Sequence, residues 1–205
     1  MRKPIWKYLT LALETLPIVE PIYEFGAFQV DGDATYDVRQ LCPGREFVGC
    51  DMREGPGVDK VLDLHNIDLA DASAGTVIMM DTLEHVEYPH RAVEEVHRIL
   101  RPGGVLIMSS VLDFFIHDHP NDFWRFTPDG FRSLLKPFTQ SHVGYYGREV
   151  FPHTLVGVGC KGLEYDLSTY LQRYQVWADK QTALVEKISI KMMRDAIEAL
   201  DAQLN

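Results

Sequence analysis

Four acidic side chains stand at or near the ends of four short apolar runs: Glu24, Asp51, Asp63 and Asp81. If these runs are parallel strands of an open α/β sheet, their carboxyl ends meet at the edge where such sheets bind ligands. A carboxylate accepts two hydrogen bonds from a ribose diol and attracts ammonium or sulfonium groups electrostatically. The succession therefore predicts a ligand that carries hydroxyl groups and positive charge, although a single acid at such a position also serves as a loop starter.

A glycine follows the first of these acids at the distance that a tight strand-to-loop turn requires. Gly26 lies two residues after Glu24, where the backbone would have to approach a ligand closely. The remainder of a GxGxxG pattern is missing, because residues 27–30 are Ala-Phe-Gln-Val. A pyrophosphate cradle is therefore poorly supported, and an adenosine ligand without phosphates fits better than a nicotinamide dinucleotide.

Five short apolar runs supply the strands that must position these side chains. They cover residues 22–25, 47–50, 61–64, 76–80 and 105–112, and their β-branched content suits buried parallel strands. Between the fourth and fifth runs, an apolar face over 89–100 predicts a helix that Pro102-Gly103-Gly104 terminates. A strand, helix and parallel strand in this order form a right-handed crossover, so we expect an open α/β sheet.

The segments outside these runs are predicted to close the sheet and cover it. Residues 3–16 have the spacing of an amphipathic helix, and Thr127-Pro128 begins a short one. Residues 142–148 and 154–160 are expected to form an antiparallel hairpin, with Pro152 in its loop. The expected organisation is an α/β domain over 1–162 and a helical extension over 163–205. The extension either packs on its own domain or forms a homodimer through an apolar face, which includes Leu184, Ile188 and Met192.

Composition excludes several classes of function. The 205 residues include 30 Asp and Glu against 20 Lys and Arg, a net charge of −10, and 46% are hydrophobic. An acidic globular chain is not expected to bind nucleic acid or an anionic membrane surface, because both require a basic footprint. Three well-separated cysteines form neither a disulfide framework nor a zinc pattern, and no apolar run approaches the roughly 20 residues of a membrane span. We therefore expect a reduced, cytoplasmic protein.

The order of these motifs resembles that of class I S-adenosylmethionine-dependent methyltransferases over about residues 20–160. This resemblance implies a Rossmann-like sheet of five parallel strands and a closing hairpin, seven in all, with helices on both faces. The chain departs from the family in keeping only one glycine in the first loop and a long connection in place of a compact helix. The matching stretches are Glu24-Phe25-Gly26, Val48-Gly49-Cys50-Asp51, Leu62-Asp63-Leu64, Asp81-Thr82-Leu83-Glu84-His85-Val86 and Arg98-Ile99-Leu100-Arg101-Pro102-Gly103-Gly104.

By position, the resemblance implies S-adenosylmethionine as cofactor and assigns its contacts. The implied contacts are Glu24 and Gly26 by the methionine and ribose, Asp51 on the ribose hydroxyls, Met52 against the adenine ring, Asp63 on the adenine amino group with Leu64 beside it, and Asp81 near the methyl donor and substrate.

The segment after the fifth strand, residues 116–128, resembles a stretch found in a bacterial subgroup of the family and holds the candidates for catalysis. The sulfonium is already activated, so the protein must align an acceptor and exclude water, and an oxygen acceptor of high pKa also needs a base. His117 is the first candidate for this base and His119 the second, although both also suit structural roles. Together with Asp122 they allow a metal site, but their spacing does not support one, and we expect no metal. His85 is expected to act as a hydrogen-bonding anchor.

Aromatic and basic residues near this segment are candidates for acceptor contacts. Trp124 and Tyr145 are predicted to wall an acceptor pocket, and Arg125 to bind an anionic acceptor, although core packing and ion pairs explain them equally. The sequence thus favours in-line methyl transfer to oxygen or nitrogen of a small molecule, such as a sugar or secondary metabolite. The alternative is a cofactor-binding protein without catalysis that acts as a sensor or assembly partner.

Overall fold

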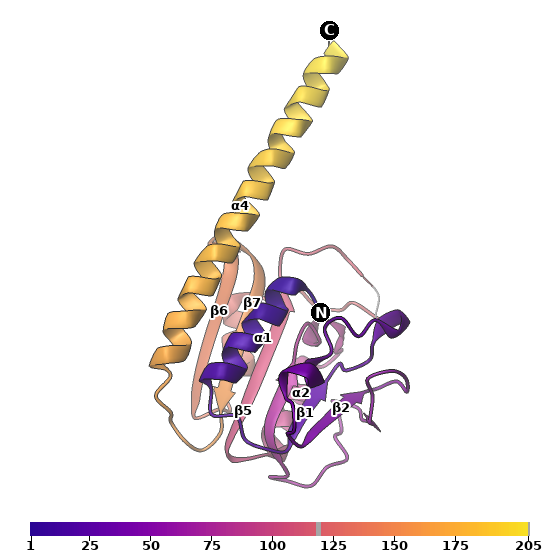
Figure 1. Cartoon of the computed structure of the whole chain (residues 1–205), viewed down its shortest axis with the longest axis vertical. Coiled ribbons are helices and arrows are strands. Elements are labelled where there is room, and N and C mark those ends of the chain that lie inside the picture. Colours follow the sequence, from indigo (N-terminus) through magenta and orange to yellow (C-terminus); the bar gives the residue numbers. More distant parts are fainter. Residues whose placement is uncertain (118–119, 205) are drawn as a thin grey trace.

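The protein is built on one mixed β-sheet, seen in a computed structural model (Figure 1). The structure describes residues 1–117 and 120–204, apart from the side chains of Asp31 and of residues 195–204. Within these residues, seven strands lie in the order β3-β2-β1-β4-β5-β7-β6. The expected open α/β sheet with a closing hairpin is therefore confirmed.

The first five strands are parallel and lie close to the predicted runs. Strand β1 pairs with β2 on one side and β4 on the other, so it occupies the centre of the parallel part. Every residue of β1 and of β4 is buried, which explains why these runs are continuously apolar. The strands are β1 (Ile22–Phe25), β2 (Phe47–Asp51), β3 (Lys60–Val61), β4 (Ala74–Met79) and β5 (Leu100–Val111).

The third strand is shorter than the sequence predicts. The expected strand over 61–64 is wrong beyond Val61, because the chain turns there. The carboxylate of Asp63 accepts a hydrogen bond from the amide of His65 at 2.8 Å, and the amide of Asn66 donates to the carbonyl of Asp63 at 3.1 Å. Asp63 therefore starts a turn, and a side chain that hydrogen-bonds its own backbone two residues on competes with strand pairing.

The antiparallel hairpin forms from β6 (Gln140–Arg148) and β7 (Phe151–Cys160), and β7 inserts between β5 and β6. Pro152 lies inside β7 and not in the loop as expected. It pairs with Gly147, where the register of the two strands shifts. A proline has no amide to donate, so a bulge at the start of a strand is a position that tolerates it.

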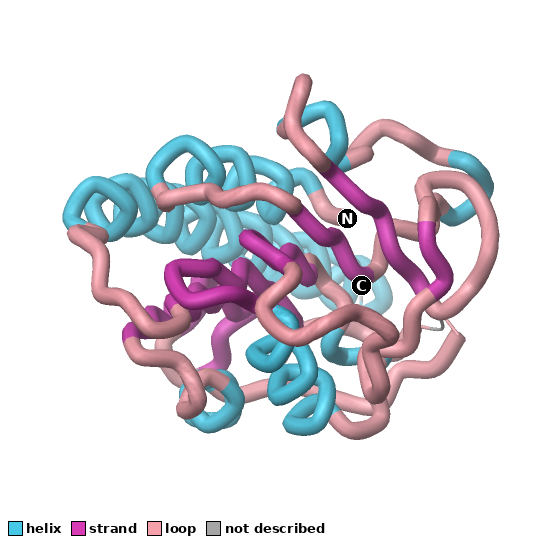
Figure 2. The backbone as a smooth tube through the Cα atoms, turned by 90° about the horizontal axis from the view of Figure 1, so that it is seen from below, coloured by secondary structure: helices cyan, strands magenta, loops and turns pink. Residues whose placement is uncertain are grey.

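Helices cover both faces of the sheet, as Figure 2 shows. On one face, α2 (Pro89–Ile99) and α3 (Pro128–Leu134) contribute Val93, Val96 and Phe131 to a core with strands β4 and β5. On the other face, α1 (Lys3–Thr15) and α4 (Ser168–Leu204) share a second core, which contains Tyr8 and Tyr170. The hydroxyls of these two tyrosines lie 2.9 Å apart and form a buried hydrogen bond that joins the two helices.

The connection from β1 to β2 contains two short 3₁₀ helices, η1 (Val30–Gly32) and η2 (Val38–Leu41), and no α-helix is among its described residues. Helix α1, which comes from the start of the chain, packs on this side of the sheet. Its Ile5 and Leu9 belong to the same core as Ile22 of β1. The N-terminal helix thus covers apolar sheet surface near an irregular connection.

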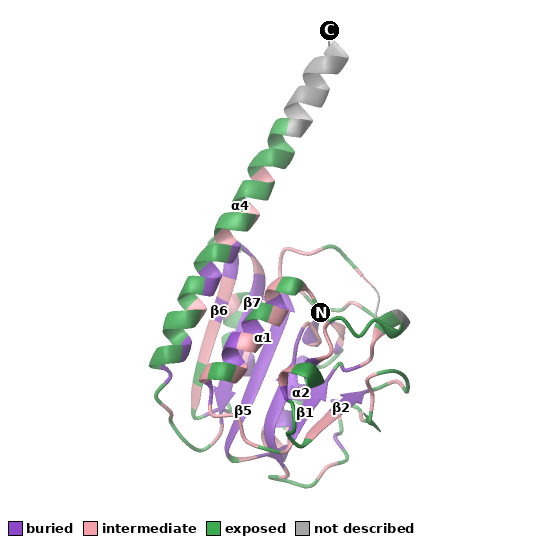
Figure 3. Ribbon diagram, viewed as in Figure 1, coloured by how far each residue is buried: buried purple, intermediate pink, exposed green. Residues whose placement is uncertain are grey.

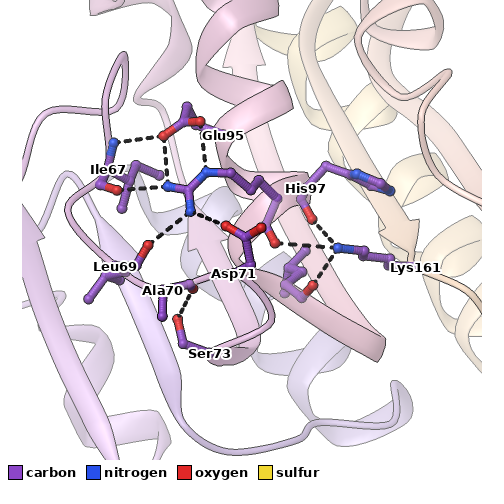
Figure 4. A network of polar contacts seen from close by, with 10 residues as sticks. Ile67, Leu69, Ala70, Asp71, Ser73, Glu95, His97 and Lys161 are labelled. Carbon is purple, nitrogen blue, oxygen red and sulfur yellow. Dashed lines mark hydrogen bonds and ion pairs between the residues drawn. The ribbon is translucent and has the colours of Figure 1, made fainter.

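A guanidinium on α2 fastens the loop between β3 and β4. Arg98 donates to the carbonyls of Ile67 and Leu69 at 2.8 and 2.9 Å, and to both carboxylate oxygens of Glu95 at 2.9 Å. Figure 4 shows these carbonyls beside Glu95, with Lys161 reaching the end of α2. The Lys161 ammonium donates to the carbonyls of His97 and Leu100, which a helix end leaves unsatisfied. This network holds the loop that follows the 62–65 turn.

Helix α4 packs on the domain over its first turns and extends beyond the sheet (Figure 1). Green exposed residues dominate it after that point in Figure 3, and Leu184, Ile188 and Met192 are at least half exposed. The apolar face expected there is therefore uncovered in the single chain, and the homodimer stays a prediction. No helix among the described residues is long and apolar enough to cross a membrane.

The contact between α1 and α4 predicts a stability difference between two adjacent residues. Trp177 is 6% exposed, and its indole Nε1 donates to the carbonyl of Pro4 at 3.1 Å, whereas Val176 is 66% exposed. We expect Trp177→Ala to lower the free energy of unfolding by about 3–5 kcal/mol in urea titrations, because it leaves a cavity. Val176→Ala should change this free energy by less than about 0.5 kcal/mol. Equal losses for both variants would contradict the packing described.

Candidate functional site

A cavity of about 610 Å³ opens at the carboxyl ends of β1, β2 and β4. Residues from the N-terminus, from the loops after these strands and from the segment after β5 line it. All four acids that the sequence places at strand ends are among its lining residues. The structure therefore brings Glu24, Asp51, Asp63 and Asp81 to one edge of the sheet, as their positions predict.

Glu24 lies within β1 and is only 8% exposed. Burial, with a further contribution from the negative charge of Asp37, raises the pKa of its carboxyl group to about 8. The group thus keeps its proton at neutral pH in the absence of a cation. A cationic ligand in this cavity would reverse the balance and favour the carboxylate.

Asp51 is the last residue of β2, and its side chain is 7% exposed. The amide and the guanidinium Nε of Arg53 both donate to its Oδ1, each at 3.1 Å. This arrangement fixes the carboxylate at the cavity wall. Met52, predicted to lie against an adenine ring, lines the cavity and is 60% exposed.

Asp63 and Leu64 line the cavity from the turn after β3. The side chain of Asp63 is 61% exposed, and its Oδ1 accepts from the ring Nδ1 of His65 as well as from the His65 amide, both at 2.8 Å. Leu64 is 9% exposed and belongs to the core under the cavity. Asp63 is thus the most exposed of the four acids.

Asp81 lies two residues after β4 and is held by a residue from the far end of the chain. The guanidinium of Arg2 donates to both carboxylate oxygens, at 2.9 and 3.1 Å, and Ser109 Oγ donates to Oδ1 at 2.8 Å. Although burial opposes ionisation, Arg2 and Ser109 keep the pKa of Asp81 below its usual value. Its φ of +50° is a sparsely populated conformation that these bonds stabilise.

Gly26 lines the cavity with a φ of +91°, as a turn that requires glycine would have. A Cβ at this position would lie 2.6 Å from Thr82 Oγ1. The close approach that excludes a side chain is therefore to Thr82, which itself lines the cavity and donates to the carbonyl of Phe25 at 3.1 Å.

His117 and His85 both line the cavity and lie edge to face, with ring centroids 4.8 Å apart. His85 Nδ1 lies 2.5 Å from the carbonyl of Asn121, which confirms its expected anchoring role. The amide of His117 donates to Asp122 Oδ2 at 2.8 Å, so the backbone is fixed at this point. His119, the second candidate base, lies outside the described residues.

None of the three predicted acceptor contacts is among the cavity-lining residues that the structure describes. The Trp124 Nε1 donates to the carbonyl of Glu87 at 3.1 Å, and Arg125 forms an ion pair with Asp122 at 2.5 Å. Tyr145 lies on β6 and packs against the core on the α2 side of the sheet. Arg125 is therefore engaged in an ion pair and Tyr145 in core packing, whereas Trp124 is 44% exposed outside the described cavity lining.

Two residues that line the cavity were not predicted as site residues from the sequence. Arg2 is 79 positions from its partner Asp81, so no local pattern indicates the pair. Glu84 is fully buried, and its Oε2 accepts from Ser110 Oγ at 2.6 Å. Burial, together with the negative charge of Asp81, raises the pKa of Glu84. No local pattern indicates its burial, because its neighbours Asp81, Thr82 and His85 are polar.

Comparison with known proteins agrees with this geometry. A family model described as a methyltransferase domain matches residues 31–108. No curated protein matches the chain. The matched segment contains Asp51, Asp63, Asp81, Glu84 and His85.

Solved structures similar to this chain include three methyltransferases. One, a SAM-dependent methyltransferase from Archaeoglobus fulgidus, has a TM-score of 0.61 at 12% identity, with 78% of this chain and 95% of that chain covered. A Thermotoga maritima protein, described as a possible histamine N-methyltransferase, has a TM-score of 0.51 at 20% identity, covering 77% and 91%. The 1,6-didemethyltoxoflavin-N1-methyltransferase of Burkholderia thailandensis, solved with S-adenosylhomocysteine, has a TM-score of 0.55 at 18% identity, covering 78% and 77%. At these identities the likeness establishes the fold.

The raised pKa of Glu24 predicts how stability depends on pH. Between the usual value of 4.5 and about 8, the folded protein holds a proton that the unfolded chain has lost. The contribution of Glu24 to folding therefore falls as the pH rises through this range. Glu24→Gln has no titrating group at this position, so it lacks this pH-dependent loss. The melting temperature of the variant minus that of wild type should therefore increase from pH 5 to pH 8. A Glu54→Gln control at an exposed position should follow wild type. Parallel melting curves for Glu24→Gln and wild type across this range would contradict the assignment.

Proposed function

We propose that the chain is a class I S-adenosylmethionine-dependent methyltransferase and that it methylates an oxygen or nitrogen atom of a small molecule; a methyltransferase-domain model over residues 31–108 and the shared fold support the family. The observation that carries the proposal is the cavity at the carboxyl edge of the sheet, lined by four acidic side chains. S-adenosylmethionine brings a sulfonium, an ammonium and a ribose diol, which are the groups that carboxylates recognise.

The acidic surroundings support the cofactor specifically. Glu24 and Asp51 are both under a tenth exposed, so water would screen the attraction between a bound cation and either carboxylate only weakly. We assign Glu24 to the methionine end of the cofactor and Asp51 to the ribose hydroxyls. Met52 and Leu64 supply apolar contact for adenine, and Asp63 an acceptor for its amino group.

The size and charge of the cavity support a small acceptor. A volume of about 610 Å³ falls within the roughly 300–1,000 Å³ of small-molecule sites. The net charge of −10 opposes binding of a polyanion such as nucleic acid. A sugar or secondary metabolite with a free hydroxyl or amine fits these limits.

We assign the exclusion of water from the reaction to the residues after β5. Phe114, Phe115 and Phe123 line the cavity beside His117. Methyl transfer needs the acceptor atom in line with the sulfur–methyl bond and a site from which water is excluded. An oxygen acceptor must also lose its proton, and Glu84, His85 and His117 are titratable side chains that line the same cavity.

Asp51 provides the direct test of the cofactor assignment. Removing a charged hydrogen-bonding partner costs about 1.5–3 kcal/mol, so we expect Asp51→Ala to weaken binding of S-adenosylmethionine and S-adenosylhomocysteine by roughly 10- to 100-fold. Isothermal titration calorimetry measures both affinities. Asp129→Ala, at a side chain that is 91% exposed, is the matched control and should bind as wild type does. No binding of either compound to wild type, or equal binding to both variants, would refute the assignment.

Turnover tests the methyl transfer itself. The purified protein is incubated with S-adenosylmethionine and a panel of sugars, phenols and amines, and S-adenosylhomocysteine is quantified by mass spectrometry. We expect S-adenosylhomocysteine to accumulate with one class of acceptor, in an amount equal to that of the methylated product. Cofactor that is bound but never consumed with any acceptor would instead favour a binding protein without catalysis.

A further inference from the structure

Three side chains that the cofactor assignment does not use converge on one point of the cavity. Glu84 and His85 lie in the 3₁₀ helix η3 (Leu83–His85), and His117 lies in the segment after β5. Each offers one ligand atom, and these atoms all lie within 4.8 Å of one another. The backbone holds the two segments together, because the amide of Phe123 donates to the carbonyl of Glu84 at 2.7 Å.

Glu84 carries an unsatisfied oxygen at this point. Its Oε2 accepts from Ser110, but its Oε1 is buried without a hydrogen-bond partner among the residues that the structure describes. A buried carboxyl oxygen without a donor is unfavourable, because no hydrogen bond replaces the water that it has lost. A bound cation would satisfy this oxygen.

Both histidines bond a backbone carbonyl through Nδ1. His85 Nδ1 lies 2.5 Å from the carbonyl of Asn121, and His117 Nδ1 lies 3.2 Å from the carbonyl of Phe115. A carbonyl only accepts, so each Nδ1 carries the proton in these bonds, and Nε2 of the neutral ring carries the lone pair. Metal-binding histidines commonly have their second nitrogen held in this way.

A carboxylate completes the support of His117. Asp122 Oδ2 lies 3.2 Å from His117 Nδ1, and the side chain of Asp122 is 2% exposed. Arg125 holds this carboxylate with two bonds of 2.5 and 2.7 Å. A carboxylate hydrogen-bonded to a ligating histidine fixes the ring and raises its basicity. Asp122 and Arg125 are therefore positioning residues for His117.

We propose that Glu84, His85 and His117 bind a divalent first-row transition-metal ion such as Zn²⁺. One carboxylate and two imidazoles form a donor set that zinc accepts with an open position. Ligands at roughly 2.0–2.2 Å from one ion stand about 3.3 Å apart, so modest side-chain rotations would close the cluster around it. This assignment replaces our expectation that the site holds no metal.

The role of the ion rests on the proposed methyl transfer. Its open position would take the hydroxyl oxygen of the acceptor and lower the pKa of that hydroxyl, so that the proton passes to water. The oxygen then forms a bond to the methyl carbon while the sulfur–methyl bond breaks. The bonding pair stays on sulfur, which becomes the neutral thioether of S-adenosylhomocysteine.

Metal binding is tested on the full chain after dialysis against chelator. Titration with ZnCl₂ by calorimetry, and with CoCl₂ by visible absorption, should show one equivalent bound, with cobalt bands typical of nitrogen and oxygen ligands. We expect His85→Ala, His117→Ala and Glu84→Gln each to weaken zinc binding by at least tenfold, and Asp122→Asn to weaken it less. His65→Ala is the matched control, because His65 lines the same cavity outside the cluster.

Two results would overturn the metal site. One is the absence of stoichiometric binding to wild type; the other is a loss in His65→Ala as large as that in His85→Ala. Melting curves of the metal-free variants show which are folded, and Asp122→Asn provides a second variant if a ligand substitution unfolds the chain. Calorimetry with S-adenosylhomocysteine on the same samples separates the two proposals. If wild type binds S-adenosylhomocysteine but no metal ion, only the metal site is refuted. If wild type does not bind S-adenosylhomocysteine, the proposed function is refuted.

Discussion

The site depends on the burial of carboxyl groups at one edge of the sheet. Four carboxyl groups are buried there. Glu24, Asp51 and Glu84 are under a tenth exposed, and the side chain of Asp81 is 14% exposed. Arg2 and Arg53 compensate two of them through direct ion pairs. The other two have raised pKa values, because a buried carboxylate without a cation is unfavourable. Without a ligand, these two groups hold protons, which remove the unfavourable buried charge. A cationic ligand can replace the protons, so this edge of the sheet favours cationic ligands.

The ends of the chain build part of this edge. Helix α1 delivers Arg2 to Asp81, and α1 is in turn held by α4 through the hydrogen bond between Tyr8 and Tyr170. Arg2 also lies over the ring of Phe114, 5.0 Å from its centroid, in the segment after β5. The N-terminal helix thus connects the two sides of the cavity, and the C-terminal helix keeps it in place. Because α1 and α4 share one core, the packing of the C-terminal helix supports the position of Arg2 at the site.

The sequence predicts the elements that local pattern controls and misses what distant contacts decide. Continuous apolar runs located β1 and the hairpin, and the acids at strand ends located the cavity edge, since the topology of parallel strands brings those ends together. The end of β3 was missed because the Asp63 turn competes with the strand. Arg2 was missed because its partner is 79 residues away. For Tyr145 the sequence left acceptor contact and core packing open, because alternation along β6 does not reveal which side chains meet the core on the α2 side, where Tyr145 packs.

His117 shows how the structure changes a chemical assignment that residue type alone allows. A neutral imidazole has one lone pair, and the bonds from Nδ1 to the Phe115 carbonyl and toward Asp122 place that pair on Nε2. The same lone pair cannot both accept a proton from the acceptor and bind a metal ion. His85 stands beside it with its own Nδ1 bound to a carbonyl, and Glu84 adds a buried oxygen without a donor among the described residues. A general base needs neither of these neighbours, whereas a metal ion needs both. A bound ion that lowers the pKa of the acceptor also removes the need for a base, so the two neighbours favour His117 as a ligand over His117 as a proton acceptor.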